Sequence, residues 1–352
     1  MAMDRADRLN RRAILAGLGA AAAGASPTLA RAASPDDQRK LTVIDFHNHH
    51  VDPAHTLTTM AALPPAARAP WEAINRNLAD TSALLASIEE TGISARVVNT
   101  PTAFIADADG NVPPGTIETI NDGLARLVAA HPGRVFALAT VDAFSGEAGA
   151  RELTRAVRDL GLSGAFVESA KGDLLLDAPQ ARPTLVTAAM LGVPVFVHPV
   201  NDKAFSRRFG RYRRLGTMFA RGTINSAALV ALLEGGVFDE VPNLHIVVTT
   251  LALGGVLLAG GFGDGAGIRA DTPAASRRHV YVDTMGLNPA AIRASVDLLG
   301  ADHVLVGTDW PIIREALIHD RLREAFTAAG LSPADQELVA SGNVARLLKL
   351  AA

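Results

Sequence analysis

The sequence predicts a (β/α)8 TIM barrel, and three observations favour this fold class. The chain has 352 residues, which is long for an average domain but ordinary for a single barrel of this kind. Near-continuous apolar runs alternate with helical patterns, as buried parallel strands and their covering helices do. No glycine-rich phosphate-binding pattern follows the first apolar run, which weighs against a dinucleotide-binding open sheet.

The predicted strands are eight short apolar runs. They span residues 41–46, 95–99, 134–141, 164–168, 193–198, 244–250, 279–284 and 303–309. Polar side chains stand at or beside the ends of these runs: His47, His49, Asn99, Asp142, Glu168, His198, Thr249, Thr250, Asp283 and Asp309. The C-terminal ends of barrel strands meet at one rim, where barrel enzymes have their active sites. The sequence therefore predicts that these side chains gather around one site.

Helical patterns lie between the predicted strands, over residues 81–92, 116–133, 150–161, 228–242 and 289–300. The first begins at Thr81, has apolar residues at helical spacing and ends at Gly92. Residues 52–77 are longer than an ordinary strand-to-helix connection. We expect this segment to form a lid insertion after the first strand, with Trp71 either lining the pocket or packing in the core.

Composition excludes several classes of function. The formal net charge is −3 and the sequence has no long basic run, so no nucleic-acid partner is expected. The sequence has no cysteine, which excludes disulfides and thiolate metal sites. Any metal must therefore bind histidine and carboxylate groups, and the partner that we expect is a small-molecule substrate.

Residues 1–32 resemble a targeting segment more than a part of the barrel. Arg11 and Arg12 precede an apolar run that is shorter than the ~20 residues needed to cross a membrane. An Ala-Arg-Ala triplet, a small-x-small cleavage pattern, ends at residue 32. We predict a signal read by the twin-arginine export machinery, and a mature periplasmic domain of residues 33–352 with no transmembrane segment. A disordered alanine-rich tail is the alternative.

His47 and His49 are predicted to form the first part of a metal site. Alternate residues of a strand share a face, so these two imidazoles point the same way. His198, at the end of the fifth strand, and Asp309, at the end of the eighth, complete the set. This set suits a divalent ion, with Zn favoured and Mn, Fe or Co also open. Asp309 is also the expected catalytic proton acceptor from a metal-activated water, unless it caps the following helix.

Three further strand-end residues are weaker candidates for the site. Glu168 could be an additional ligand, a substrate contact or a partner that orients a ligand imidazole. The alternative is a rim carboxylate paired with a cation such as Lys171. Asn99 and Asp283 are candidates of the same kind, with buried hydrogen bonding as the alternative.

The stretch from residue 205 to residue 222 carries six arginines after the fifth strand. Arginine binds carboxylates through a two-pronged geometry. We expect a loop at the rim in which Arg207, Arg208 and Arg211 bind the carboxylate of an acidic substrate. A solvated basic loop or a homo-oligomer contact is an equally weighted alternative.

Several motifs resemble those of a known superfamily. "DFHNHH" resembles the H-x-H motif of the amidohydrolase superfamily, "LGVPVFVHP" its fifth-strand histidine motif and "LVGTDWP" its eighth-strand aspartate motif. Residues 163–199 and 229–248 more narrowly resemble the amidohydrolase-related branch. That branch includes aminocarboxymuconate-semialdehyde decarboxylase, resorcylate-type decarboxylases and lactone hydrolases. The resemblance covers about residues 41–350 and implies a metal-dependent enzyme.

One position departs from the family pattern. The resemblance implies a catalytic histidine after the sixth strand in a pattern like H-x-G-G, whereas "TTLALGG" places Ala252 there. A methyl group cannot transfer a proton, so we expect a hydrolase in which metal-activated water attacks a C–N or lactone C–O bond of a small acidic substrate. The alternatives are a metal-dependent non-oxidative decarboxylase of an aromatic or muconate-like acid, a hydratase, or a non-catalytic periplasmic protein that binds a metal or ligand.

Overall fold

The computed structural model describes residues 41–55, 57, 65–106, 112–261, 268–313 and 317–350. Residues 40–352 form one compact unit. The predicted export signal, residues 1–32, lies outside the described residues and stays a prediction. None of the helices in the described ranges combines the length and the apolar character that a membrane crossing requires.

The strands form a parallel barrel. They are β1 (Ile44–His49), β2 (Ala95–Asn99), β3 (Val135–Ala137), β4 (Ala139–Thr140), β5 (Ala165–Glu168), β8 (Val195–His198), β9 (Ile246–Val248), β10 (Val280–Asp283) and β11 (Val304–Leu305). Their order is β1-β2-β3 in one sheet and β11-β10-β9-β8-β5-β4 in the other. The third strand that the sequence predicts, residues 134–141, corresponds to both β3 and β4, which are separated only by Leu138. This segment pairs with the first sheet through β3 and with the second through β4. A short antiparallel hairpin, β6 (Ala170–Lys171) and β7 (Leu174–Leu175), follows β5.

Backbone hydrogen bonds close the barrel between its first and last strands. Phe46 N donates to Val306 O at 2.8 Å, and Asp309 N donates to His47 O at the same distance. Asn48 and Trp310 form a parallel bridge at this seam. The predicted (β/α)8 barrel is therefore confirmed, with the eighth strand joined to the first at the level of the histidines.

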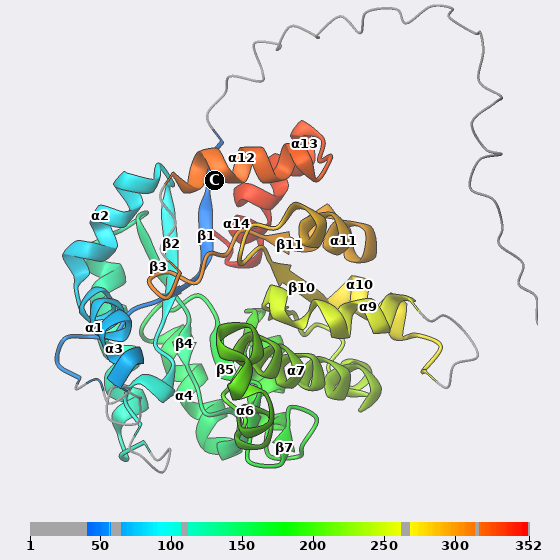
Figure 1. Ribbon diagram of the computed structural model, residues 1–352. Coiled ribbons are helices and arrows are strands. Elements are labelled where there is room, and N and C mark those ends of the chain that lie inside the picture. Colours follow the sequence, from blue (N-terminus) through cyan, green and yellow to red (C-terminus); the bar gives the residue numbers. More distant parts are fainter. Residues whose placement is uncertain are drawn as a thin grey trace, which may run out of the picture. The chain divides into compact units, whose positions relative to one another are not determined.

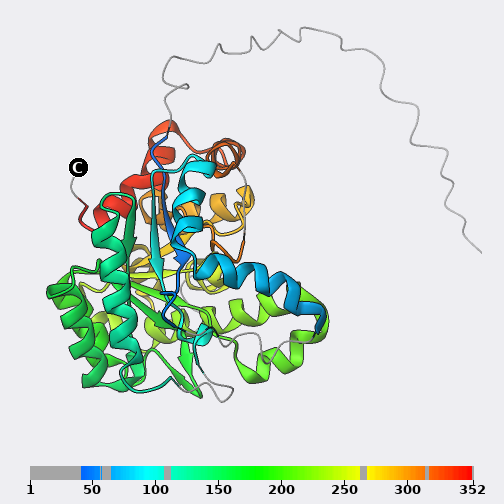
Figure 2. The ribbon, with the colours of Figure 1, turned by 90° about the vertical axis from the view of Figure 1, so that its left-hand side faces the viewer.

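The helices surround these strands (Figures 1 and 2). They are α1 (Pro65–Leu78), α2 (Thr81–Thr91), α3 (Thr116–Ala130), α4 (Glu147–Arg158), α5 (Arg182–Leu191), α6 (Lys203–Phe209), α7 (Arg213–Glu234), α8 (Val237–Glu240), α9 (Leu253–Gly261), α10 (Thr272–His279), α11 (Pro289–Leu299), α12 (Ile318–Ala328), α13 (Pro333–Glu337) and α14 (Asn343–Leu347). Short turns of other helix types complete the list: η2 (Thr102–Phe104), η3 (Ala143–Ser145), η4 (Gly210–Tyr212), η5 (Thr250–Ala252), η6 (Ala301–His303) and η7 (Leu338–Gly342).

Two predicted segments differ from what the structure shows. The arginine-rich stretch, residues 205–222, is helical and not a loop: it lies in α6, η4 and the first half of α7. In the predicted lid, residues 52–77, the second half is helix α1, while residues 56 and 58–64 lie outside the described residues. Trp71 packs against the apolar core and its ring lies 6.4 Å from that of Phe104. A lid function stays a prediction.

The core has an inner and an outer apolar layer. The inner layer fills the barrel with side chains from successive strands: Ile44, Phe46, Ala95, Val97, Leu138, Phe166, Phe196, Val247, Tyr281 and Leu305. The outer layer includes the alternate strand residues, such as Val195 and Val197, and packs against the helices. Because side chains alternate along a strand, a residue two positions beyond an inner-layer residue also faces the barrel axis. This places Asn99, Glu168, His198 and Asp283 above the inner layer.

A β-bulge in β1 changes this alternation for the first two histidines. Asp45 is paired with Arg96 and Asn48 with Val98, so Phe46 and His47 together face one residue of β2. The rings of Phe46 and His47 both contact Phe196, at centroid distances of 5.3 and 4.9 Å. Without the bulge, His47 and His49 would share the outward face of Asp45. The bulge therefore turns both imidazoles into the barrel.

Candidate metal centre

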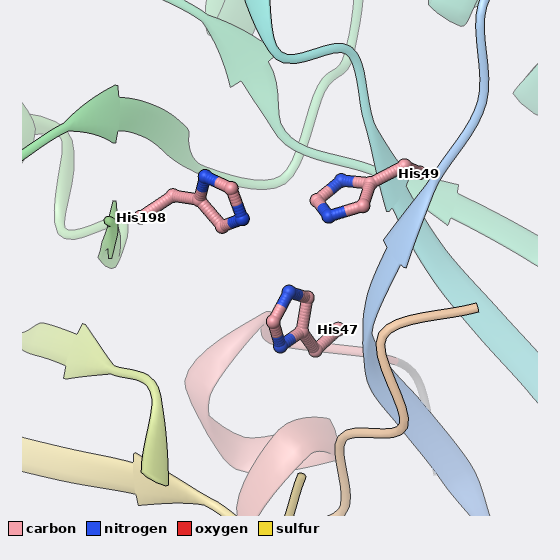
Figure 3. Close-up of side chains that lie close together, drawn as sticks. All are labelled: His47, His49 and His198. Atoms are coloured by element: carbon pink, nitrogen blue, oxygen red, sulfur yellow. The ribbon is translucent and has the colours of Figure 1, made fainter. Parts of the chain in front are cut away.

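Three histidine side chains converge at the C-terminal rim of the barrel. His47 and His49 belong to β1, and His198 is the last residue of β8. One ring nitrogen of each lies within 4.8 Å of the others, and the three rings face a common centre (Figure 3). The three residues are only 1%, 1% and 7% exposed, so the cluster is buried.

The two imidazoles of β1 are each held through Nδ1. His47 Nδ1 lies 2.6 Å from Asp283 Oδ2, and His49 Nδ1 lies 2.8 Å from Asn99 Oδ1. Both acceptors are buried residues at the ends of other strands, β10 and β2. A proton on Nδ1 leaves the electron pair of Nε2 free for a metal. The geometry thus favours an orienting role for Asp283 and Asn99 over direct ligation.

The three-histidine cluster fits a divalent metal ion. His47 Nε2 is buried and has no hydrogen-bond partner among the described residues. Leaving such an atom without a partner is costly, and a metal ion is a partner that imidazole nitrogens readily accept. Burial lowers the pKa of His49, and burial together with the charge of Arg221 places the pKa of His198 well below its ordinary value. Both rings are therefore in the neutral form that binds metal.

Asp309 lies beside this cluster at the seam of the barrel. Its Oδ1 is 3.2 Å from His49 Nε2 and 3.5 Å from His47 Nε2. Its φ of 64° is the left-handed conformation, which Asp adopts more readily than most residues. Burial would raise the pKa of Asp309, but the hydrogen bond with His49 and the nearby positive charges outweigh it, and this pKa is lowered. An ionised carboxylate thus adjoins two of the three imidazoles.

Glu168 ends β5 next to His198, its neighbour in the parallel register. Its Oε1 accepts a hydrogen bond from Thr102 Oγ1 at 2.5 Å. Lys171, the ion-pair partner considered from the sequence, pairs instead with Asp142 at 2.6 Å. Burial raises the pKa of Glu168. Glu168 therefore lies at the rim beside the cluster. The ion pair with Lys171, which would have given it a purely structural role, is not formed.

The arginines selected from the sequence do not reach the cluster. Arg207, Arg208 and Arg211 are exposed, and the guanidinium group of Arg211 stacks on the ring of Tyr212. Arg221, on the same stretch but in α7, lies beside the cluster instead, with its Nη2 3.4 Å from His198 Nε2.

The sequence carries a signal that could have identified Arg221. Its neighbours Ala220 and Gly222 are small and both are buried. An arginine between two small residues in a helical pattern indicates a helix face packed closely against the barrel, unlike the exposed arginines that precede it.

Gly307 is a second position that the sequence analysis missed. A Cβ at this residue would lie 2.8 Å from the Cβ atoms of both His47 and Asp283. Real Cβ atoms do not approach each other so closely, so the hydrogen-bonded pair occupies the space that a side chain here would need. The glycine of the "GTD" motif thus makes room for the metal cluster.

Ala252, the position that departs from the family pattern, lies in η5. It is fully buried and belongs to the outer apolar layer. Its N–H donates to Thr249 O at 2.8 Å. The residue therefore contributes packing and no proton-transfer group.

The comparisons with known proteins place the chain in a family. A family model described as "Amidohydrolase" matches residues 44–350, so the chain belongs to the amidohydrolase family. It is 29% identical over 294 residues to the gamma-resorcylate decarboxylase of Polaromonas sp., covering 75% of this chain and 85% of that protein. It is 26% identical over 239 residues to the 2-amino-3-carboxymuconate-6-semialdehyde decarboxylase of Dictyostelium discoideum, covering 66% of each.

A solved structure agrees with these relatives. The dihydroxybenzoic acid decarboxylase of Polaromonas sp., crystallised with manganese and the inhibitor 2-nitroresorcinol, is 25% identical. It superposes with a TM-score of 0.72 over 88% of this chain and 97% of that one. The chain is accordingly a metal-dependent enzyme of the amidohydrolase family, with a divalent metal site at His47, His49 and His198.

These relatives show that the prediction of a hydrolase is wrong. The two relatives and the solved structure named above are decarboxylases, which supports the alternative reaction and not attack of water on a C–N or lactone C–O bond. The prediction rested on Ala252. Absence of one imidazole does not select hydrolysis, because Asp309 and Arg221 still bring charged groups to the same rim.

Proposed function

We propose that the protein is a metal-dependent, non-oxidative decarboxylase of a small aromatic acid. The observation that carries this proposal is the position of Asp309 beside two imidazoles of a buried three-histidine cluster inside an amidohydrolase barrel. The decarboxylase activities of its relatives support the reaction class.

The metal would be held by His47, His49 and His198, with Asp309 as the fourth protein ligand. Three imidazoles and a carboxylate suit Zn²⁺ or Mn²⁺, and a structurally similar decarboxylase contains manganese. A bound divalent ion supplies Lewis-acid polarisation of the substrate oxygens that it coordinates.

The reaction breaks the bond between a ring carbon and its carboxylate carbon, and releases CO₂. The electron pair of that bond stays on the ring carbon, which takes up one proton. We assign Asp309 to carry this proton, because its carboxylate is the acidic group that approaches both imidazoles of β1. Its lowered pKa leaves Asp309 ionised at the start, so it takes one proton from solvent water and delivers it to the ring carbon, and the overall reaction consumes that proton.

Aromatic side chains beside the cluster suit an aromatic substrate. The ring of Phe104 lies 5.8 Å from that of His49, and Trp71 lies next to Phe104 at 6.4 Å. Phe104 thus borders the cluster with an aromatic face that suits a planar ligand, and Trp71 supports it from the core side.

The test is the fate of the carboxyl group in ¹⁸O-labelled water. Metal-loaded protein and 2,6-dihydroxybenzoate should yield CO₂ and an aromatic product without a newly incorporated hydroxyl or carboxyl oxygen. Asp309→Asn should lower kcat by about 10²- to 10⁴-fold, the range of a lost proton-transfer group. A hydrolysis product carrying ¹⁸O, with no CO₂ released from a panel of aromatic and muconate-like acids, would refute the proposal.

We also propose export by the twin-arginine route, on the pattern of residues 1–32. Periplasmic fractions should contain a chain that starts near Ala33. Replacing Arg11 and Arg12 by lysine should retain the longer chain in the cytoplasm. Equal export of both versions would contradict this route.

A further inference from the structure

Arg221 is the charged side chain of α7 that reaches the metal cluster. Its Nη2 lies 3.4 Å from His198 Nε2, and its Nη1 lies 3.1 Å from Asn201 Oδ1. Burial lowers the pKa of Arg221, but arginine starts so high that the guanidinium remains charged. A positive group thus faces the cluster from the side of His198.

This guanidinium lacks a carboxylate partner within the described part of the chain. Asp309 and Glu168 attract it through space, yet neither forms an ion pair with it, whereas Arg155 and Arg182 each pair with a glutamate. Its two hydrogen-bond contacts are to neutral groups, an amide and an imidazole. A partly buried cation with only neutral partners is poorly compensated, so an anionic ligand would be favoured beside it.

Close packing of α7 holds Arg221 in this place. A Cβ on the next residue, Gly222, would lie 2.6 Å from Leu251 O, so the glycine lets α7 approach the η5 turn directly. Ser226 extends the same contact, since its hydroxyl bonds to the backbone of Ala252 and Gly255. The cation at this part of the rim therefore comes from α7, while position 252 offers only a methyl group.

We propose that Arg221 binds the carboxylate of the substrate and makes the site select acids over their decarboxylated products. The inference rests on the proposed function and names the group that recognises its substrate. A guanidinium matches a carboxylate with two parallel N–H donors, which a neutral ring hydrogen or hydroxyl cannot replace. Asn201 Oδ1 accepts a hydrogen bond from Arg221 Nη1, so the guanidinium is oriented before the ligand binds.

The experiment compares binding of two ligands that differ only in the carboxylate. Metal-loaded wild-type protein, Arg221→Met and Arg221→Lys are titrated by calorimetry with 2,6-dihydroxybenzoate and with resorcinol, the same ring without the carboxylate. Arg221→Met should weaken binding of the acid by about 10- to 100-fold, as expected for a lost charge-assisted contact, and change resorcinol binding less than twofold. Arg221→Lys should lie between, because lysine keeps the charge but not the two-pronged geometry.

Arg214→Met is the matched control. Arg214 belongs to the same helix and is exposed, so this variant should bind both ligands as the wild type does. Thermal unfolding and metal content are measured for every variant. If Arg221→Met does not fold, the affinity of Arg221→Lys for the acid tests the role of Arg221. With turnover, Arg221→Met should raise KM more than it lowers kcat, because the contact is made in the bound substrate.

The outcomes separate this inference from the proposed function. Three results would each overturn the role of Arg221: equal loss of acid and resorcinol binding in Arg221→Met, an unchanged acid affinity in that variant, or no binding of 2,6-dihydroxybenzoate by the wild type. Wild-type protein that binds the acid through Arg221 but releases no CO₂ would instead overturn the decarboxylase proposal and leave the carboxylate subsite standing.

Discussion

His47 and Asp283 lie 236 positions apart in the chain, and their side chains meet with 2.6 Å between Nδ1 and Oδ2. The other oxygen of Asp283 accepts from the backbone N–H groups of Thr250 and Met285. Burial would lower the pKa of His47, but the Asp283 carboxylate outweighs it, so this pKa is raised. The pair thus fixes the direction of His47 Nε2.

Replacing Asp283 by alanine should weaken metal binding. The imidazole of His47 loses the acceptor that orients it, and loss of such a partner typically costs about 10- to 100-fold in metal affinity. Competition with a coloured chelator measures the dissociation constant. The control is Asp297→Ala, which removes an exposed partner of Arg293. Equal affinity in Asp283→Ala and this control would show that the contact does not orient a ligand.

Replacing Gly307 by alanine should disturb the contact between His47 and Asp283. The new Cβ would press on His47 and Asp283, which must then move apart. We expect a loss of about 1–3 kcal/mol in the free energy of unfolding, as for an overpacked core site, together with weaker metal binding. Urea unfolding and metal titration check the two effects. Gly210→Ala is the control, because this glycine has open space around it and no positive φ.

Arg96 of β2 is hydrogen-bonded to two residues of β1. It is fully buried, and its Nη1 donates to Asp45 Oδ2 at 2.5 Å and to Asn48 Oδ1 at 2.6 Å. Arg96→Met leaves the Asp45 carboxylate without its cation, so the free energy of unfolding should fall by about 3–5 kcal/mol. Urea unfolding measures the change. Adding Asp45→Asn should restore part of the loss, and strictly additive losses would refute a coupled pair.

Protonation of His279 should oppose folding at low pH. Burial lowers its pKa from 6.5, and its ring stacks on Phe238 at 4.4 Å while Nδ1 donates to Leu244 O. Below pH 6.5 the unfolded chain therefore binds more protons than the folded one at this site, so stability falls as the pH drops. In His279→Gln the fall in unfolding free energy between pH 7 and pH 5, measured on metal-loaded protein, should be smaller than in the wild type. An identical pH dependence would contradict this contribution.

Much of the fold could be predicted because its signals are local. Buried parallel strands read as short apolar runs, and their polar ends mark the active rim. The same signals located His47, His49 and His198, whose grouping into a metal site the structure confirms. Arg221 was missed because charge alone does not tell which arginine of an arginine-rich helix faces the barrel, and the small residues on either side of it were the signal to use. The reaction was predicted wrongly because Ala252 was judged without the other charged groups of the rim.

The order of the strands and the presence of imidazoles at their ends follow from residue patterns along the chain, because side-chain periodicity and strand length are local properties. The inward direction of His47 and His49 does not follow from periodicity, since regular alternation would have placed them on the outer face with Asp45. The bulge at Phe46 and His47 turns these two imidazoles toward the barrel axis. The bulge itself depends on the pairing of β1 with β2 and on its hydrogen bonds with the last strand. The partners that orient these imidazoles likewise come from other strands, so they meet only when the barrel closes.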